Sequence, residues 1–285
     1  MQYRIHKPGA PLVGHVDFLW ALSDAPDHAR ERILPNGTIE LVVNLAEDRF
    51  AIASARAAGS LQLPGAMVSG CYRAPFEIDT RVHASIVGVH FAPGGAAGLL
   101  GAAPGELADT HVGLGELWAG AAVELRERLC AAASVDERFR ILERALRDRL
   151  ARAREPRAAV RAALVALERP GSEVGRVTQD LQLSRRRFIE IFTQDVGMTP
   201  KRYARVRRFQ RALSRATAQR APAWAELATA CGYADQSHLC REWAELAGVS
   251  PSELVMLRNA RVKEGHLAVP DEGVKSIQDV VASAP

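Results

Sequence analysis

LQLSRRRFIEIFTQDVGMTPKRY, residues 181–203, and GYADQSHLCREWAELAGVSPSEL, residues 232–254, are two versions of one pattern. Each version sets a natural helix N-cap, Ser184 or Asp235, ahead of a helix-length run that ends in Gly-x-Ser/Thr-Pro. When VGMTP of the first version is aligned with AGVSP of the second, the offset is 51 residues. The chain therefore carries a short supersecondary unit twice.

Each copy is predicted to fold as a helix, a tight turn and a second helix. In the second helix of the first copy, Phe188 and Phe192 are spaced i, i+4 and are expected to face inward. Leu239 and Trp243 have the same spacing in the second copy. This pattern is typical of a helix-turn-helix, whose second helix lies in the DNA major groove. The predicted helices cover about residues 173–181 and 184–195 in the first copy, and about 222–231 and 235–247 in the second.

The expected exposed faces of both second helices carry side chains that can read base edges. Arg pairs bidentately with guanine, and Gln pairs with adenine. An arginine run alone is often only a solvated face, but its place inside a doubled helix-turn-helix favours the reading role. The candidates are Arg185, Arg186 and Arg187 in the first copy, and Gln236, Ser237, His238 and Arg241 in the second.

Residues 201–215 join the two copies and hold seven basic residues and no acidic one. Apolar residues at helical spacing predict one long helix here, with one packed face and one cationic face. A cationic helix face can neutralise DNA phosphates and position the reading helices. The predicted phosphate contacts are Arg187, Lys201, Arg202, Arg205, Arg208 and Arg211.

Residues 157–260 resemble the DNA-binding domain of AraC/XylS-family transcription regulators. The resemblance is most specific in the second copy, at Ala228, Gly232, Tyr233, Ser237, Leu239, Trp243, Gly248 and Pro251. It implies an all-helical tandem helix-turn-helix domain whose two reading helices enter successive major grooves. It also implies base contacts by Arg186, Ile189 and Glu190 in the first reading helix, and by Gln236, Ser237, His238 and Arg241 in the second.

The first copy departs from the family pattern at three positions. Gln182 stands where a turn glycine is usual, and Thr178 where a small alanine is usual. Glu190 stands where a basic residue is common; its carboxylate can accept from cytosine but is repelled by phosphates. These departures put the strength of the first reading helix in question.

The first hundred residues read as short strands rich in Val, Ile and Phe, punctuated by Gly, Pro and Asn. We expect an antiparallel barrel or sandwich, followed by two amphipathic helices over 114–133 and 134–154. This region resembles the cupin-like N-terminal domain that accompanies such DNA-binding domains in many bacterial regulators, and that resemblance supplies no ligand. The predicted strands are HVDFLWAL, TIELVVNL, RFAIA, AMVSG, FEIDT and VHASIVGVHF.

The expected class is therefore α+β with two domains, 1–155 and 157–260, and a flexible tail at 261–285. Residues 1–156 hold 17 Lys and Arg against 19 Asp and Glu, a net charge of −2. Residues 157–260 hold 17 against 10, a net charge of +7. A near-neutral front domain joined to a basic one suits a sensor attached to an anion-binding module.

Several classes are excluded or disfavoured by composition. No run of apolar residues is long enough to span a membrane, and the N-terminus lacks the pattern of a secretion signal. The cysteines are scattered and form no C-x-x-C pair, which favours reduced thiols in a cytoplasm and no zinc site. The histidines lack metal-ligand spacing, so neither a metal nor a cofactor is expected. The four cysteines are Cys71, Cys130, Cys231 and Cys240.

The sequence thus predicts a cytoplasmic, bacterial, one-component transcription regulator that is not an enzyme. Its partners would be double-stranded promoter DNA and a small-molecule effector, with RNA polymerase and a second copy of the chain as further candidates. Two other functions stay open: a cupin-like metal enzyme tethered to DNA, and a module whose helix-turn-helix units bind protein. Candidate effector-pocket residues are Trp20, Arg32, Glu40, Asn44, Arg73 and His90.

Overall fold

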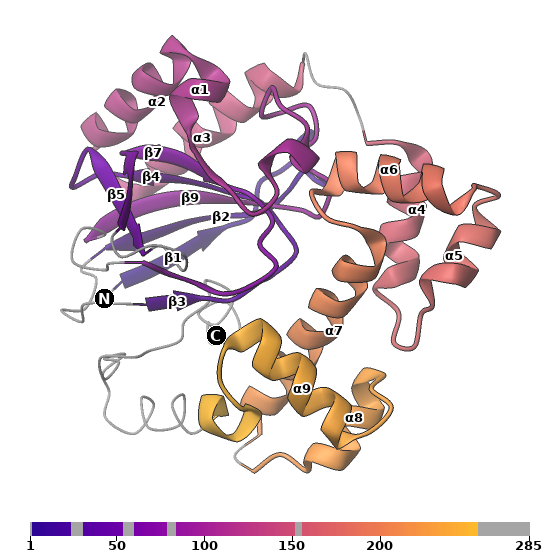
Figure 1. Ribbon diagram of the computed structural model, residues 1–285. Helices are drawn as coiled ribbons and strands as arrows, with labels where there is room; N and C mark the ends of the chain where they lie inside the picture. The colour runs from indigo at the N-terminus through magenta and orange to yellow at the C-terminus, as the bar shows by residue number, and fades with distance from the viewer. Residues whose placement is uncertain are drawn as a thin grey trace.

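The computed structural model describes residues 2–23, 31–53, 60–78, 84–151, 156–219 and 221–255. They form an N-terminal domain of two antiparallel sheets flanked by helices and a C-terminal domain of helices (Figure 1). The predicted α+β, two-domain class is confirmed. The predicted tail at 261–285 lies outside the described residues, and the boundary near residue 156 stays a prediction.

The larger sheet has the strand order β1-β2-β9-β4-β7-β10, antiparallel throughout. Strands β4 and β7 are buried along their whole length, which explains the apolar runs at 41–43 and 66–68. The strand bounds are β1 (Gln2–His6), β2 (Val16–Ser23), β9 (Ser85–Phe91), β4 (Glu40–Asn44), β7 (Ala66–Ser69) and β10 (His111–Gly113).

The smaller sheet has the order β3-β8-β5-β6. The two sheets meet in an apolar core around Trp20, Phe50 and Met67. In the described part of the chain they share no strand and do not close into a barrel, so the sandwich is the form found. The strand bounds are β3 (Glu31–Ile33), β8 (Phe76–Ile78), β5 (Arg49–Ala53) and β6 (Ser60–Pro64).

The strand predictions succeed in the middle of the sheets and fail at their edges. The apolar runs correctly predict β2, β4, β5, β7, β8 and β9. The missed strands, β1, β10, β3 and β6, are the four edge strands. An edge strand is half solvated and often short, so it lacks the dense apolar pattern that identifies a central strand.

Three helices cover one face of the larger sheet, above β7 and β4 in Figure 1. The first predicted helix is broken in two, because Ala119 adopts a φ of 50° between them. The second begins as predicted, since the Ser134 hydroxyl accepts from the Glu137 N–H at 3.2 Å. Their bounds are α1 (Leu114–Trp118), α2 (Gly120–Ala131) and α3 (Val135–Leu150), preceded by the 3-10 helix η2 (Pro104–Leu107).

The C-terminal domain contains both predicted helix-turn-helix units. The side chain of Ser184 accepts from the N–H of Arg187 at 3.2 Å, and Asp235 accepts from the N–H of His238 at 2.6 Å, so both predicted N-caps are confirmed. No described helix combines the length and apolarity needed to cross a membrane. The helices are α4 (Ala158–Leu167), α5 (Val174–Asp180), α6 (Arg185–Val196), α7 (Pro200–Thr217), α8 (Trp224–Cys231) and α9 (Gln236–Ala247).

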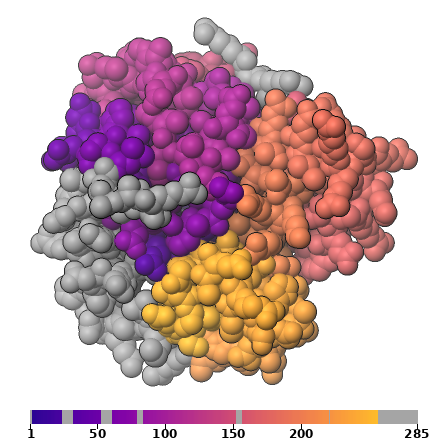
Figure 2. All heavy atoms as spheres, in the orientation of Figure 1, coloured from indigo at the N-terminus to yellow at the C-terminus, as the bar shows by residue number. Residues whose placement is uncertain are grey.

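One apolar core runs through both domains, and the C-terminal helices lie directly against the N-terminal body (Figure 2). Cys71 and Leu34 of the first domain belong to the same cluster as Val196 and Tyr203 of the second. A Cβ atom built on Gly37 would lie 3.5 Å from the Tyr203 ring, so this loop rests on α7. The two domains therefore pack as a unit in this structure.

The turn of the first unit is strained where the sequence departs from the family. Gln182 has a φ of 54°, and its counterpart Gly232 has a φ of 84°. Left-handed backbone costs a non-glycine residue roughly 1–2 kcal/mol, partly offset by the freedom glycine has in the unfolded chain. We therefore expect Gln182→Gly to raise the free energy of unfolding by about 1 kcal/mol, measured by urea denaturation.

Gln179→Gly is the matched control, because Gln179 is exposed inside α5 three residues earlier. Glycine disfavours right-handed helical backbone, so at this position in the last turn of α5 it should lower the free energy of unfolding by up to about 1 kcal/mol. If both substitutions changed stability in the same direction, the backbone conformation at Gln182 would not be the cause.

Candidate nucleic-acid interface

The N-terminal half of α6 presents a polar surface over a buried apolar one. Arg185 and Arg186 are exposed, whereas Phe188 and Phe192 are completely buried. Ile189 is 36% exposed beside the arginines, which makes it available for an apolar contact with a thymine methyl group. The predicted reading residues of the first unit therefore share one exposed surface.

Two charged residues of α6 are engaged with each other. Arg187 forms an ion pair of 3.1 Å with Glu190, and both side chains are more than half exposed. Such an exposed pair contributes little stability and is easily broken. Glu190 nevertheless places an acid beside the predicted reading arginines, as the sequence indicated.

Helix α9 repeats this arrangement in the second unit. Gln236, Ser237 and Arg241 are exposed, while Leu239 and Trp243 are completely buried. In Figure 1 the turns that join α5 to α6 and α8 to α9 both lie away from the β sheets. The N-terminal turns of the two reading helices are thus free of the N-terminal domain.

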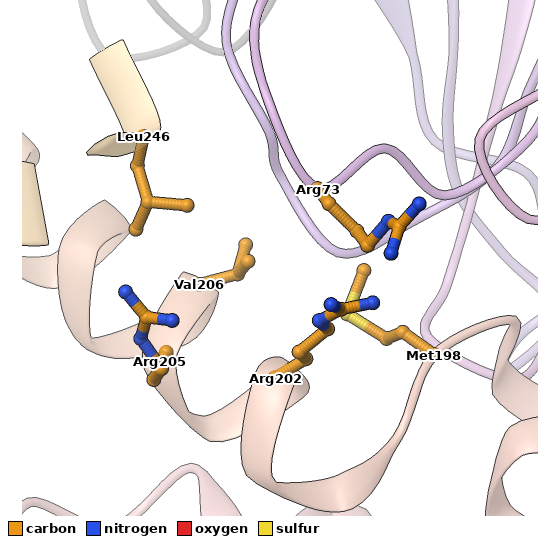
Figure 3. Close-up of a pocket in the computed structure, with 6 residues that line it drawn as sticks. All are labelled: Arg73, Met198, Arg202, Arg205, Val206 and Leu246. Carbon is orange, nitrogen blue, oxygen red and sulfur yellow. The ribbon is translucent and has the colours of Figure 1, made fainter. Parts of the chain in front are cut away.

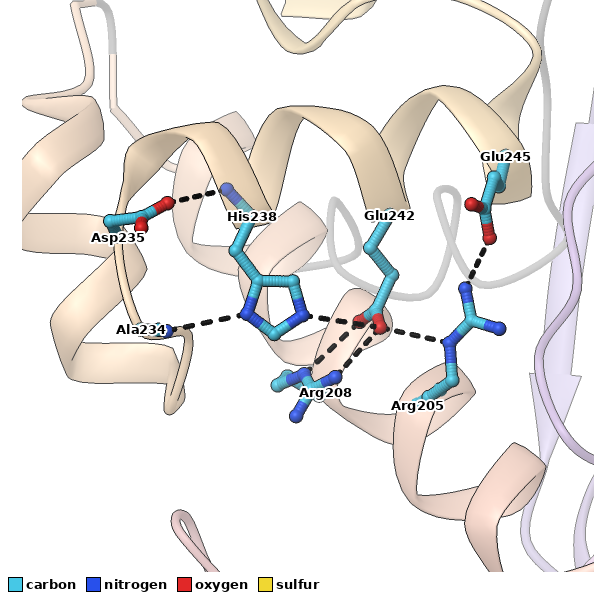
Figure 4. A network of polar contacts seen from close by, with 7 residues as sticks. All are labelled: Arg205, Arg208, Ala234, Asp235, His238, Glu242 and Glu245. Carbon is cyan, nitrogen blue, oxygen red and sulfur yellow. Dashed lines mark hydrogen bonds and ion pairs between the residues drawn. The ribbon is translucent and has the colours of Figure 1, made fainter.

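His238 differs from its exposed neighbours because its ring is held by the protein. Its Nδ1 atom lies 3.4 Å from the N–H of Ala234, and its Nε2 atom lies 3.9 Å from Glu242 (Figure 4). Its ring also meets that of Tyr233 edge-on, with ring centroids 5.3 Å apart. An imidazole fixed in this way supports the turn before α9. It is less available to a base than Gln236 or Arg241.

A buried carboxylate ties α9 to the long helix α7. Glu242 is 4% exposed and accepts two hydrogen bonds from Arg208, at 3.0 and 2.7 Å, and one from Arg205 at 2.9 Å (Figure 4). Arg205 also pairs with Glu245. Burial alone would raise the pKa of Glu242, but the hydrogen bonds and charges of Arg208 and Arg205 outweigh it and lower that pKa.

A second acid, Glu168, neutralises the other side of α7. Its carboxylate lies 2.7 Å from Arg207 and 3.9 Å from Arg211, and its backbone carbonyl accepts from Arg211 at 3.2 Å. The Tyr203 hydroxyl donates to the same carboxylate at 2.7 Å. Glu168 therefore joins the end of α4 to the middle of α7.

These pairs correct one expectation about α7. The sequence suggested cations without acidic partners, but Arg205, Arg208 and Arg211 are half-buried and bind Glu242 or Glu168. The acids come from the end of α4 and from α9, outside the basic segment 201–215. Glu242 could have been found, because it falls at spacing i+3 from Leu239 on the buried face of α9, where a carboxylate needs a cation.

Lys201 and Arg202 remain exposed on the first turn of α7. Arg202 faces a small cavity between the domains, where it lies with Arg73, Arg205 and three apolar side chains (Figure 3). The cavity is about 30 Å³ in volume. The apolar lining residues are Met198, Val206 and Leu246.

Three of the predicted effector-pocket residues meet inside the β sandwich. Glu40 accepts a hydrogen bond from the Trp20 indole at 3.2 Å and contacts the imidazole of His90. Phe18 stacks on His90 with ring centroids 4.5 Å apart. Trp20, Glu40 and His90 are at most 8% exposed, and a Cβ atom at Gly88 would collide with the Trp20 ring.

The other three predicted pocket residues lie elsewhere, so the six residues do not meet at one place in this structure. The Asn44 side chain closes the turn after β4 by accepting from two N–H groups and donating to Arg49. Arg73 pairs with Asp109 at the cavity between the domains. Arg32 binds Glu77 and reaches the end of α9. Alternation along the strands could not reveal these loop and interdomain contacts.

No cluster of three or more His, Cys, Asp or Glu side chains in the described ranges is placed to hold a metal ion. Burial lowers the pKa of His111 to about 4. It packs between Tyr72 and Phe76, with ring centroids 4.6 and 4.7 Å away. It therefore acts as a neutral core ring.

Residues 177–256 match a family model described as a helix-turn-helix domain, and residues 4–113 match a domain of unknown function (DUF6597). No curated protein matches the chain. Among solved structures, the chain is similar to the C-terminal domain of AraT, a response regulator from Geobacillus stearothermophilus, with 19% identity, a TM-score of 0.33, and coverage of 35% of this chain and 85% of that one.

The chain is also similar to two structures of ToxT from Vibrio cholerae. The apo form has 10% identity, a TM-score of 0.45, and coverage of 90% of this chain and 97% of that one. A form bound to an unsaturated fatty acid has 9% identity, a TM-score of 0.45, and coverage of 89% and 95%.

The capped tandem units and the domain match define a helix-turn-helix DNA-binding protein. More narrowly, its C-terminal helix-turn-helix domain is of the AraC type.

Glu242→Gln tests the tie between α7 and α9. Breaking a buried ion pair should lower the free energy of unfolding by about 3 kcal/mol at pH 7. This is the low end of the usual cost for a buried pair, because both arginines are partly exposed. Because the folded pKa of Glu242 is lowered, its contribution is fully present above the ordinary value of 4.5 and is lost as pH falls through the folded pKa. The difference between parent and variant should therefore be constant from pH 7 to 5 and narrow below 4.5 in urea denaturation.

Glu245→Gln is the control, because Glu245 pairs with the same Arg205 but is 64% exposed. It should cost less than about 1 kcal/mol. A Glu242→Gln deficit that persisted unchanged to low pH would show that the carboxylate charge is not what stabilises this contact.

Proposed function

We propose that this regulator recognises a two-part operator, with α6 in one major groove and α9 in the next. The single observation that carries the proposal is the equivalence of the two exposed, capped N-terminal turns on α6 and α9. Such turns hold the positive ends of helix dipoles, which favours their approach to DNA. The proposed base readers are Arg185, Arg186, Ile189, Glu190, Gln236, Ser237, His238 and Arg241.

Among these, the free cations should contribute most to base recognition. Arg185, Arg186 and Arg241 form no ion pair with any described residue and are exposed, so they can approach guanine without first losing a partner. Glu190 and His238 each have a protein partner. We expect their contribution to sequence preference to be smaller.

The proposed phosphate contacts also divide into exposed cations and cations held by a buried or half-buried acid. Lys201 and Arg202 are exposed and begin α7, whereas Arg205, Arg208 and Arg211 would have to share their charge with Glu242 or Glu168. We propose that Lys201, Arg202 and Arg187 supply direct phosphate contacts. The internally paired arginines would act chiefly by fixing α7 against α9.

We propose that the N-terminal domain responds to a small-molecule effector and that the protein works in a bacterial cytoplasm, where its DNA target lies. The support is the group of polar side chains formed by Trp20, Glu40 and His90 beside the apolar core between the two sheets. Burying polar groups is costly, which suggests that this group has a role beyond packing. We further propose that the protein associates with a second copy of itself and contacts RNA polymerase.

We also propose that the chain acts by binding and not by catalysis. The alternative of a metal enzyme tethered to DNA is tested by metal analysis of the purified protein. Stoichiometric iron, zinc or manganese would favour the enzyme. The alternative of a protein-binding module is tested by salt, since DNA binding through phosphates must weaken steeply as salt concentration rises.

Arg241→Ala tests the reading role directly. Duplexes are first selected from a random pool with the parent protein, and affinities are then measured by fluorescence anisotropy. If Arg241 pairs with a base, the variant should lose about 1–3 kcal/mol at the selected site and little at unrelated DNA. A uniform loss on all duplexes would instead assign Arg241 to phosphate.

Arg128→Ala is the matched control, because Arg128 is a partly exposed arginine on α2 of the N-terminal domain. It should bind the selected duplex as the parent does. Equal affinity of the parent and Arg241→Ala would refute both roles of Arg241.

A further inference from the structure

We propose that the N-terminal domain is a brace that holds the two reading helices at a fixed separation, with Arg32 and the η2 turn as its positioning contacts. The inference rests on the proposed function and concerns which spacing between operator halves the protein accepts. It arises because the same point of both repeat units touches the N-terminal domain. Val196 and Ala247, the last residues of α6 and α9, are equivalent at the repeat offset of 51 residues.

The first anchor is at the end of α6. The thiol of Cys71 donates to the carbonyl of Val196 at 3.1 Å. Burial, followed by the charge of Asp109, raises the pKa of Cys71 to about 12, so the thiol keeps the proton that it donates. A Cβ atom on Gly105 of η2 would lie 2.9 Å from the Thr193 carbonyl, so the η2 backbone lies directly against the last turn of α6.

The second anchor is at the end of α9. Arg32 of β3 donates to the Ala247 carbonyl at 3.5 Å, and a Cβ atom on Gly248 would lie 3.2 Å from its guanidinium. A cation at this place also favours the negative end of the α9 dipole. Glu77, the cross-strand partner of Arg32 on β8, fixes the guanidinium with hydrogen bonds of 3.2 and 2.9 Å.

A third contact holds α7 midway between the anchors. Gln210 donates to the carbonyl of Pro35 at 2.5 Å, and Arg207 donates to that of Asn36 at 3.3 Å. All three contacts reach the C-terminal domain from one N-terminal domain. They leave the reading turns at the opposite ends of α6 and α9 uncovered.

The brace has a measurable consequence for DNA. Inserting one base pair between two operator halves moves them apart by about 3.4 Å and rotates one about the axis by roughly 35°. Two reading helices joined only by α7 could follow part of that change by bending at the ends of α7. Two helices whose C-terminal ends are both fixed to the N-terminal domain cannot follow that change. The parent protein should therefore reject operators in which the spacing between the two halves is altered.

The experiment selects duplexes from a random pool with the full-length parent and with Arg32→Gln, Gly105→Ala and the double variant. Arg32→Gln removes the charged donor at α9, and the alanine methyl pushes η2 away from α6. The parent should enrich two sequence blocks at one fixed spacing. The variants should enrich the same blocks over a wider range of spacings, and the preference over a one-base-pair insertion should fall about tenfold in the double variant.

Two controls match the substitutions. Arg4→Gln removes a half-exposed arginine of β1 that pairs with Asp136, and Gly115→Ala adds a methyl group where no atom lies within 4 Å. Both should keep the spacing of the parent. Thermal unfolding of each variant verifies that it is folded. If Gly105→Ala fails to fold, Arg32→Gln alone tests the brace, because it changes a single side chain where the two domains meet.

The outcomes separate this inference from the proposed function. Suppose that the parent enriches two sequence blocks, and that Arg32→Gln and the double variant enrich them at the same narrow spacing. The brace is then overturned, while the operator proposal stands. If the parent enriches no two-block site, the operator proposal fails and the brace fails with it. Widened spacing with unchanged blocks supports both.

Discussion

The geometry of the C-terminal domain depends on one buried carboxylate, that of Glu242. A carboxylate that is 4% exposed must be paired, and Arg205 and Arg208 of α7 supply three hydrogen bonds to it. An apolar pair could pack as tightly, but it would tolerate sliding of α9 along α7. Directed hydrogen bonds fix the register between the helices, and so they fix where the reading turn of α9 points.

This use of arginine limits what α7 can offer to DNA. A charge already neutralised by Glu242 or Glu168 gains less from a phosphate, because the internal pair must be weakened first. Affinity must then come mainly from cations without such partners, at the starts of α6 and α7 and in α9. The net charge of the C-terminal region therefore overstates the charge available for binding, because part of it is neutralised by Glu242 and Glu168 within the protein.

The features that could be predicted from the sequence are those set by interactions between residues close together in the chain. Caps, turns and i, i+4 pairs lie within a few residues, so the caps Ser184 and Asp235 and the helices that they begin were predicted correctly, as were the central strands. The four edge strands and the partners of α7 were not. Glu168 lies 39 residues before Arg207 in the sequence, and Arg32 lies more than 200 residues before Ala247, so no local pattern connects them. A buried charge needs a partner, but only the folded structure shows which residue that partner is.

The position of Arg32 shows how a signal in the N-terminal domain could reach DNA without covering the reading surface. An effector changes an equilibrium only if it binds two states with different affinity. Arg32 lies on β3 at the edge of the smaller sheet, and Glu77 on β8 orients it. A shift of β3 relative to β8 would disturb the guanidinium that caps α9 while leaving Glu242 and the core of the helical domain intact. Regulation by that route would act on the separation of the reading helices, and hence on which operators are accepted, more than on the affinity of either helix for its own groove.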